Sequence, residues 1–191
     1  MKGEPVFREI LKKVLEEKAS HFNVRSLSEA TGIPPSTVSH SLRALKEMGA
    51  IEVSRNGITV KNPRKILLFW CSIRRLEPLV VYRKSLQMPV QEIEGMAPPE
   101  AIFTAFTAFK HRFGYAPADY SEVYVYGNAE RFKSRFGPPS TPKERCNLIV
   151  MEADAHLKML GRATLAQIYV DLWNIPAWYA QDFINELDRM I

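Results

Sequence analysis

Residues 22–62 read FNVRSLSEATGIPPSTVSHSLRALKEMGAIEVSRNGITVKN, and local signals divide this stretch into two helices and a hairpin. The capping box of Ser26 and Glu29 predicts the start of a short helix that ends near Gly32. Two consecutive prolines then preset the backbone for a second helix, which runs to about Met48. Two helices joined by so short a turn are typical of a helix-turn-helix.

The second of these helices has an apolar face and a polar face. At about 100° per residue its apolar residues fall in one stripe, which consists of Val38, Leu42, Leu45 and Met48. The polar residues on the opposite side are Ser36, Ser39, His40 and Arg43. Hydroxyl groups near the start of such a helix suit contacts to DNA phosphates or base edges, and an arginine can donate two hydrogen bonds to guanine. The polar face therefore indicates a surface that reads the major groove, the alternative being an ordinary amphipathic helix that faces water.

The hairpin is predicted from apolar residues that alternate with polar ones around Asn56-Gly57. With this dipeptide as a two-residue loop, Val53 faces Val60 across the strands as an apolar pair. Arg55 lies at the shoulder of the hairpin, where a wing can contact the minor groove or the DNA backbone.

An amphipathic helix is predicted upstream, because apolar residues recur there at the helical period. These residues are Val6, Phe7, Ile10, Leu11, Val14 and Leu15. Charged residues lie on the other side, so we expect this helix to be half-buried. Helix, helix-turn-helix and hairpin follow one another as in a winged helix. We therefore expect residues 1–62 to form a winged helix-turn-helix domain that binds double-stranded DNA.

Positive charge is concentrated in the N-terminal part of the chain. Residues 1–75 carry 14 Lys or Arg and 7 acids, a net charge of +7, whereas residues 76–191 carry 12 and 14, a net charge of −2. A nucleic-acid-binding module joined to a neutral or acidic domain has this asymmetry. A basic segment whose charge only keeps the protein soluble gives the same asymmetry, so charge alone does not decide the function.

The run from Phe22 to Asn62 resembles the winged helix-turn-helix of MarR-like and ArsR-like prokaryotic transcriptional regulators. In those families the second helix of the motif enters the major groove and the wing grips the flanking DNA. The resemblance therefore implies a sequence-specific transcriptional regulator. It also implies which residues contact the DNA, namely Ser36, Thr37, Ser39, His40, Arg43 and Arg55.

Residues 63–75 are predicted to form a linker helix, whose apolar run 66–73 is expected to be buried between two domains or against a second subunit. Residues 76–191 alternate strands with helices and are expected to form an α/β domain. Strands are predicted at 79–82, 122–126 and 147–151, helices at 98–112 and 129–136, and two further helices after Thr164. The expected fold class of the whole chain is α+β.

Three segments of this second part carry another resemblance. They are YVYGN at 124–128, NLIVMEAD at 147–154 and TLAQIYVDL at 164–172. Together they resemble the C-terminal domain of AbiEi-like antitoxins, whose fold is similar to minimal nucleotidyltransferases. Membership would imply a promoter-binding autorepressor that has a nucleotidyltransferase-like toxin as its cognate partner.

Glu152 and Asp154 are the candidates for an alternative, enzymatic function. Carboxylates at positions i and i+2 after a buried strand point to one side and could hold Mg²⁺ in a DNA-tethered nucleotidyltransferase. Active nucleotidyltransferases also need a Gly-Ser turn about ten residues earlier, and the nearest match, Gly127-Asn128, lies more than twenty residues upstream. We therefore expect two solvated acids and no catalytic residues, metal site or cofactor.

Composition excludes several other classes. With 46% hydrophobic and 25% charged residues the chain is an ordinary globular protein, not a disordered, fibrous or membrane protein. Cys71 and Cys146 lack the spacing of a disulfide framework or a zinc site, and the N-terminus lacks a secretory signal, so a cytoplasmic location is expected. Because one winged helix reads only a short stretch of groove, we also expect a homodimer.

Overall fold

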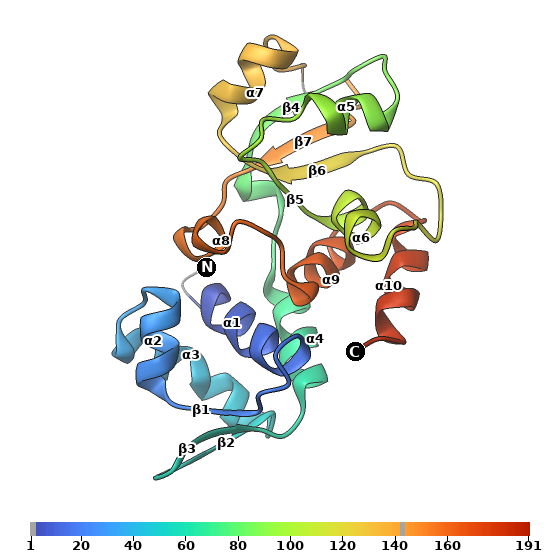
Figure 1. Cartoon of the computed structure of the whole chain (residues 1–191). Coiled ribbons are helices and arrows are strands. Elements are labelled where there is room, and N and C mark those ends of the chain that lie inside the picture. Colours follow the sequence, from blue (N-terminus) through green and yellow to red (C-terminus); the bar gives the residue numbers. More distant parts are fainter. Residues whose placement is uncertain (1–2, 142–143) are drawn as a thin grey trace.

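The computed structural model describes residues 3–141 and 144–191 (Figure 1). The fold is α+β, as expected, with an N-terminal helical part that carries a small sheet and a C-terminal part of mixed α/β structure. The N-terminal elements are α1 (Glu4–Leu15), β1 (His21–Phe22), α2 (Val24–Thr31), α3 (Pro35–Glu47), β2 (Ile51–Ser54) and β3 (Gly57–Val60). The helix α4 (Pro63–Ile73) leads from the first part to the second.

The C-terminal part is built around a four-stranded sheet in the order β4-β7-β6-β5, in which only β6 and β7 are parallel. Its elements are η1 (Glu77–Leu79), β4 (Val80–Lys84), α5 (Val90–Met96), β5 (Ile102–Phe103), α6 (Ala105–Phe113), β6 (Val123–Tyr126), α7 (Ala129–Phe136), β7 (Leu148–Met151), α8 (Ala155–Leu160), α9 (Leu165–Trp173) and α10 (Ala180–Asp188). Helices α5 and α7 cover one face of this sheet, and α6, α9 and α10 lie on the other side (Figure 1). No helix among the described residues is long and apolar enough to cross a membrane.

Helix α2 begins before the residue that was expected to cap it. Asn23 is the N-cap, and its side chain accepts a hydrogen bond from the Ser26 backbone N–H at 2.8 Å. The Ser26 hydroxyl accepts in return from the Asn23 backbone N–H at 3.2 Å. The capping box is therefore present but displaced by three residues, and Glu29 instead forms an exposed ion pair with Arg25 at 2.8 Å.

The wing hairpin has a different register from the predicted one. Val53 faces Ile58 and not Val60, and the two-residue loop is Arg55-Asn56. Because the register moves by two residues along the partner strand, every side chain keeps its face of the sheet and the pair remains apolar.

A third strand explains the shifted register. β1 pairs with β3 and completes a sheet in the order β1-β3-β2. The His21 Nε2 atom lies 2.9 Å from the Asn56 carbonyl oxygen and holds the turn. Gly57 has a φ of +131°, and a Cβ there would lie 2.7 Å from the Phe22 carbonyl oxygen. Contacts from β1, including the His21 side chain 35 residues upstream of the turn residue Asn56, therefore decide the position of the loop.

Gly57→Ala is expected to lower the free energy of unfolding by about 1–3 kcal/mol, because it adds both an unfavourable φ and a backbone clash. Urea unfolding followed by circular dichroism measures the change. Gly95→Ala is the matched control: nothing lies within 4 Å of its added Cβ, and it sits inside α5. Alanine there should stabilise the protein by about 0.5–1 kcal/mol. A Gly57→Ala variant as stable as the Gly95→Ala variant would contradict the proposed role of β1.

The predicted helix 98–112 is divided in the structure. Ile102 and Phe103 form β5, where Ile102 pairs with Tyr126 of the neighbouring strand. Helix α6 starts only at Ala105, which has a positive φ of 49°. The spacing of the aromatic residues suggested one continuous helix, but this spacing carries no information about strand pairing. Pairing with β6 adds backbone hydrogen bonds at Ile102 and Phe103.

Helix α4 packs against α1 on one side and α9 on the other. Its buried residues are Ile66, Leu67, Trp70 and Cys71, whereas Leu68 is exposed. One apolar cluster extends from Val6 in α1 to Leu187 in α10. The helices on both sides of α4 therefore share a single core.

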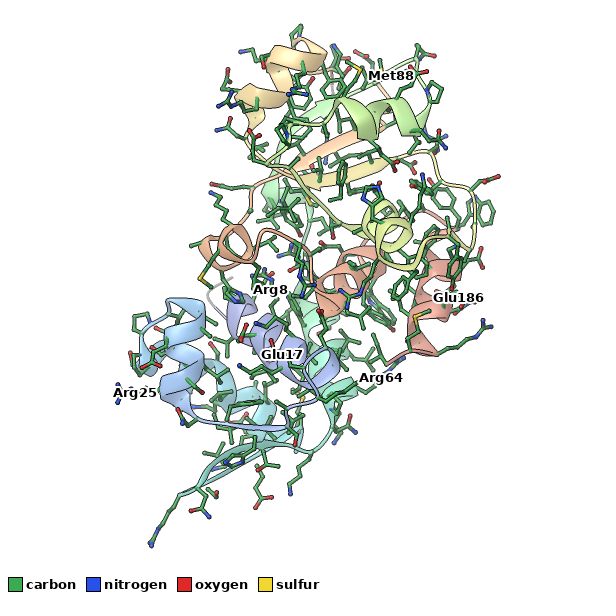
Figure 2. All side chains as sticks on the ribbon, in the orientation of Figure 1. Arg8, Glu17, Arg25, Arg64, Met88 and Glu186 are labelled. Carbon is green, nitrogen blue, oxygen red and sulfur yellow. The ribbon has the colours of Figure 1, made fainter. Side chains whose placement is uncertain are left out.

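Residues 4–11 of α1 are buried on both faces, so this part of the helix is more deeply buried than expected, whereas residues 12–15 are half-buried. Its polar side chains Glu4, Arg8 and Glu9 are at most 5% exposed, because they face the C-terminal part. Figure 2 shows Arg8 at the junction between α1 and the helices of that part. The Arg8 guanidinium donates to both carboxylate oxygens of Asp154, at 2.9 and 2.6 Å, and to Gln167 Oε1 at 2.7 Å.

A second buried cluster surrounds Asp171 of α9. Its carboxylate accepts from three neutral donors, which are Thr104 Oγ1 at 2.7 Å, Tyr126 OH at 2.6 Å and Gln167 Nε2 at 2.9 Å. Arg74, directly after α4, adds an ion pair at 3.3 Å and also pairs with Glu4 of α1. The two clusters share Gln167, so one polar network connects α1, α4, α8 and α9.

Candidate nucleic-acid interface

Helix α3 presents the polar face that the sequence indicates. Ser36, Ser39, His40 and Arg43 are exposed, Thr37 is half-buried, and the apolar residues Val38, Leu42 and Leu45 are buried. Within the described part of the chain, Arg43 forms no ion pair and no side-chain hydrogen bond. Its guanidinium is therefore available to a partner outside the protein.

The polar face of α3 is not uniform. Ser36, Thr37 and His40 border a hollow of about 680 Å³ that is also lined by Phe7 of α1 and Phe69 of α4. Ser39 and Arg43 do not line this hollow. The two groups therefore have different surroundings: Ser36, Thr37 and His40 lie at the edge of an apolar depression, whereas Ser39 and Arg43 lie outside it.

Lys46 extends the open part of this surface and was missed in the sequence. It is exposed, three residues after Arg43 and seven after Ser39, so all three lie on one side of α3. This spacing was the signal that could have identified it. A lysine at the end of the helix suits a phosphate contact, since such contacts need only a positive charge.

The wing carries its available positive charge at the tip. Arg55 is exposed at the loop, and no acid pairs with it among residues 3–141 and 144–191. Lys61, in contrast, forms an ion pair with Glu52 at 2.7 Å. The loop around Arg55 is held by the Asn56 backbone N–H, which donates to Ser54 Oγ at 3.2 Å, and by His21. Figure 1 shows the hairpin extending away from the body of the protein.

Residues 5–53 match the family model described as "Bacterial regulatory protein, arsR family". This segment is an ArsR-family helix-turn-helix. The match includes α1, which the resemblance of residues 22–62 left out, and it ends within the first strand of the wing. Neither a curated protein nor a solved structure matches the chain. The C-terminal part is not assigned to a family by these comparisons.

The carboxylates of the alternative, enzymatic function do not act together in the structure. Because β6 and β7 are parallel neighbours, Gly127, Asn128 and Glu152 meet at one edge of the sheet and line a hollow of about 480 Å³. Asp154 does not line it. Its side chain binds Arg8 and accepts from the Leu157 backbone N–H at 2.8 Å, which caps α8.

The expectation that both acids are solvated was therefore wrong for Asp154. Glu152 is exposed, whereas Asp154 is a partner of a fully buried arginine. Burial raises the pKa of Asp154, but the hydrogen bonds and positive charge of Arg8 lower it by more, so the net pKa lies below its usual value. Among the residues that the structure describes, no three His, Cys, Asp or Glu side chains gather as a metal site.

Proposed function

We propose that this protein is a sequence-specific regulator of transcription that binds double-stranded DNA through α3 and the wing. The ArsR-family helix-turn-helix with Ser39, Arg43 and Lys46 exposed on one side of α3 carries this proposal. Arg43 is assigned to a base edge in the major groove and Arg55 to the minor groove or backbone beside it. Ser36, Thr37 and His40 are assigned to the flank of the same contact surface.

Arg43→Ala is expected to cost about 1–3 kcal/mol of binding free energy on a specific site and to relax the preference at one base pair. Arg55→Ala should weaken binding to all sequences similarly and reduce the salt dependence by about one counterion. Fluorescence anisotropy against a site selected from random-sequence duplexes, repeated at several salt concentrations, measures both effects.

Arg131→Ala is the control for these variants, since Arg131 is an exposed arginine on α7, far from α3 and the wing (Figure 1). It should leave binding unchanged. If Arg43→Ala and Arg55→Ala bind DNA as the control does, the assignment of the interface to α3 and the wing is wrong.

We also propose that the regulator binds DNA as a homodimer. The support is the short stretch of groove that one winged helix reads and the two-fold symmetry common among prokaryotic operators. Exposed Leu68 on α4, Trp173 at the end of α9 and Trp178 just before α10 are among the apolar residues available to a second copy. Sedimentation of the protein with its selected duplex tests this, and a single protomer per site would refute it.

For the C-terminal part we propose a scaffolding or recognition role without nucleotidyl transfer, as in an AbiEi-like antitoxin that binds a cognate toxin and represses its own promoter. The resemblance of residues 124–128, 147–154 and 164–172 supports it, and so does the engagement of Asp154 by Arg8. Incubation with labelled nucleoside triphosphates, Mg²⁺ or Mn²⁺, and tRNA or protein acceptors tests it. Transfer that is lost on Glu152→Ala would establish the enzymatic alternative instead.

A further inference from the structure

A cavity of about 690 Å³ lies on the C-terminal sheet, apart from α3 and the wing. Its floor is a row of three side chains on neighbouring strands. Arg83 of β4 lies beside Ile149 of β7, and Ile149 lies beside Tyr124 of β6. Its walls include the segment 75–78, which connects α4 to β4, and Asn174 and Pro176, which precede α10. A volume of this size is in the range of sites for small organic molecules.

Two of the acids that line the cavity already have partners. Glu77 pairs with Arg83. Glu144 accepts from the backbone N–H of Thr141 at 3.0 Å and from its hydroxyl at 2.8 Å. Neither side chain therefore needs a further donor.

Glu122 is different. Its Oε2 atom is buried and has no hydrogen-bond partner in the part of the chain that the structure describes. Its other oxygen lies 3.5 Å from the guanidinium of Arg145, whose side chain is 85% exposed. A buried acceptor without a donor is unfavourable, and a charged acceptor is more so. Glu122 lines the cavity with a side chain that is 12% exposed, so a rotation of its carboxylate brings Oε2 to a charged donor of a ligand and recovers this free energy.

The arginines at the cavity already have acceptors: Arg83 pairs with Glu77, and Arg75 donates to the carbonyl oxygens of Ser72 and Arg74. The other groups around Glu122 suit an organic cation. Tyr124 lies two residues after Glu122, in β6, and burial together with the charge of Glu122 raises its pKa to about 12, so the ring stays neutral. The face of a neutral tyrosine ring attracts an ammonium group. Leu76, Pro78 and Pro176 provide apolar wall for the rest of a molecule.

We propose that this cavity binds a small organic molecule that carries a protonated amine, with the ammonium group on Glu122 and the apolar body against Tyr124 and Ile149. The site does not depend on the DNA-binding function, because none of its residues belongs to α3 or the wing. Its wall begins at Arg75, next to Arg74 of the buried network, so an occupant contacts the segment through which α4 joins the sheet.

Calorimetry on the full chain with phenethylamine tests the proposal. Phenethyl alcohol has the same body without charge, and 3-phenylpropionate carries the opposite charge. We expect the amine to bind and the other two to bind at least ten times more weakly. Absence of amine binding, or equal affinity for the alcohol, overturns the proposal without relying on any variant.

Glu122→Gln should weaken phenethylamine binding at least ten-fold, because the amide is neutral. Glu144→Gln is the matched control, since it removes the same charge from an acid of the cavity whose hydrogen bonds are already made, and it should retain the affinity. Thermal unfolding of both variants confirms that they fold. If the two substitutions have the same effect, the amine is not bound by Glu122 and the assigned site is wrong.

Discussion

Asp154→Ala is expected to lower the free energy of unfolding by about 3 kcal/mol, the largest effect of any single exposed or partly exposed acid. Arg8 is completely buried and loses the carboxylate that binds two of its nitrogens. Removing one partner of a buried pair leaves an uncompensated charge, which typically costs about 3–5 kcal/mol. The lower end applies here because 35% of the Asp154 side chain is exposed, so water can reach the vacated position.

Glu152→Ala is the control for this prediction. Glu152 lies two residues away, is exposed, and should change stability by no more than about 0.5 kcal/mol. Chemical unfolding of both variants at neutral pH gives the difference. Equal effects would mean that the Arg8–Asp154 pair does not hold α1 to the C-terminal part.

The same pair predicts a dependence on pH. Because the pKa of Asp154 is lowered in the folded protein, its contribution to stability is complete above the pKa of the unfolded chain, near 4, and is lost as the pH falls through the folded pKa. Unfolding measured between pH 6 and about pH 3 should show this loss in the native protein and a smaller one in Asp154→Ala. Parallel curves would contradict it.

Local signals in the sequence predicted the elements well where the elements depend on neighbours in the chain. The polar and apolar faces of α3 follow from a period of 3.6, and Val38 and Leu42 are buried while Ser39 is exposed. The predicted helix 129–136 has the same bounds as α7, which Asn128 caps at its start and Gly137 ends. In these cases the residues that decide the structure lie within one or two helical turns of one another in the sequence.

The sequence did not predict features that depend on partners far along the chain. The hairpin register is set by His21 and by the approach of β1 to Gly57, and the role of Asp154 is set by Arg8, 146 residues earlier. Read alone, Asp154 and Glu152 are a matching pair of acids after a strand. Only the packing of α1 against α8 separates a structural carboxylate from a solvated one, and no periodicity contains that information.

Asp171→Ala is expected to cost about 3–5 kcal/mol, because it leaves the buried guanidinium of Arg74 without one of its acids and leaves three neutral donors without their acceptor. In the native protein burial, and then the charge of Asp171, raise the pKa of Tyr126 well above its usual value. Burial remains in the variant, so Tyr126 keeps its proton and its O–H loses the acceptor. Chemical unfolding of the variant measures the cost.

A double-mutant cycle then separates the ion pair from the general loss of polar groups. Arg74→Met combined with Asp171→Leu should be less destabilising than the sum of the two single changes, because the double variant lacks both the guanidinium and the carboxylate of this pair. Glu4 keeps the coupling from being complete, since it pairs with Arg74 from α1 and is left without that partner in the double variant. Adding Glu4→Gln should therefore recover further stability. If the changes in the free energy of unfolding are strictly additive, Glu4, Arg74 and Asp171 do not act as one network between α1, α4 and α9.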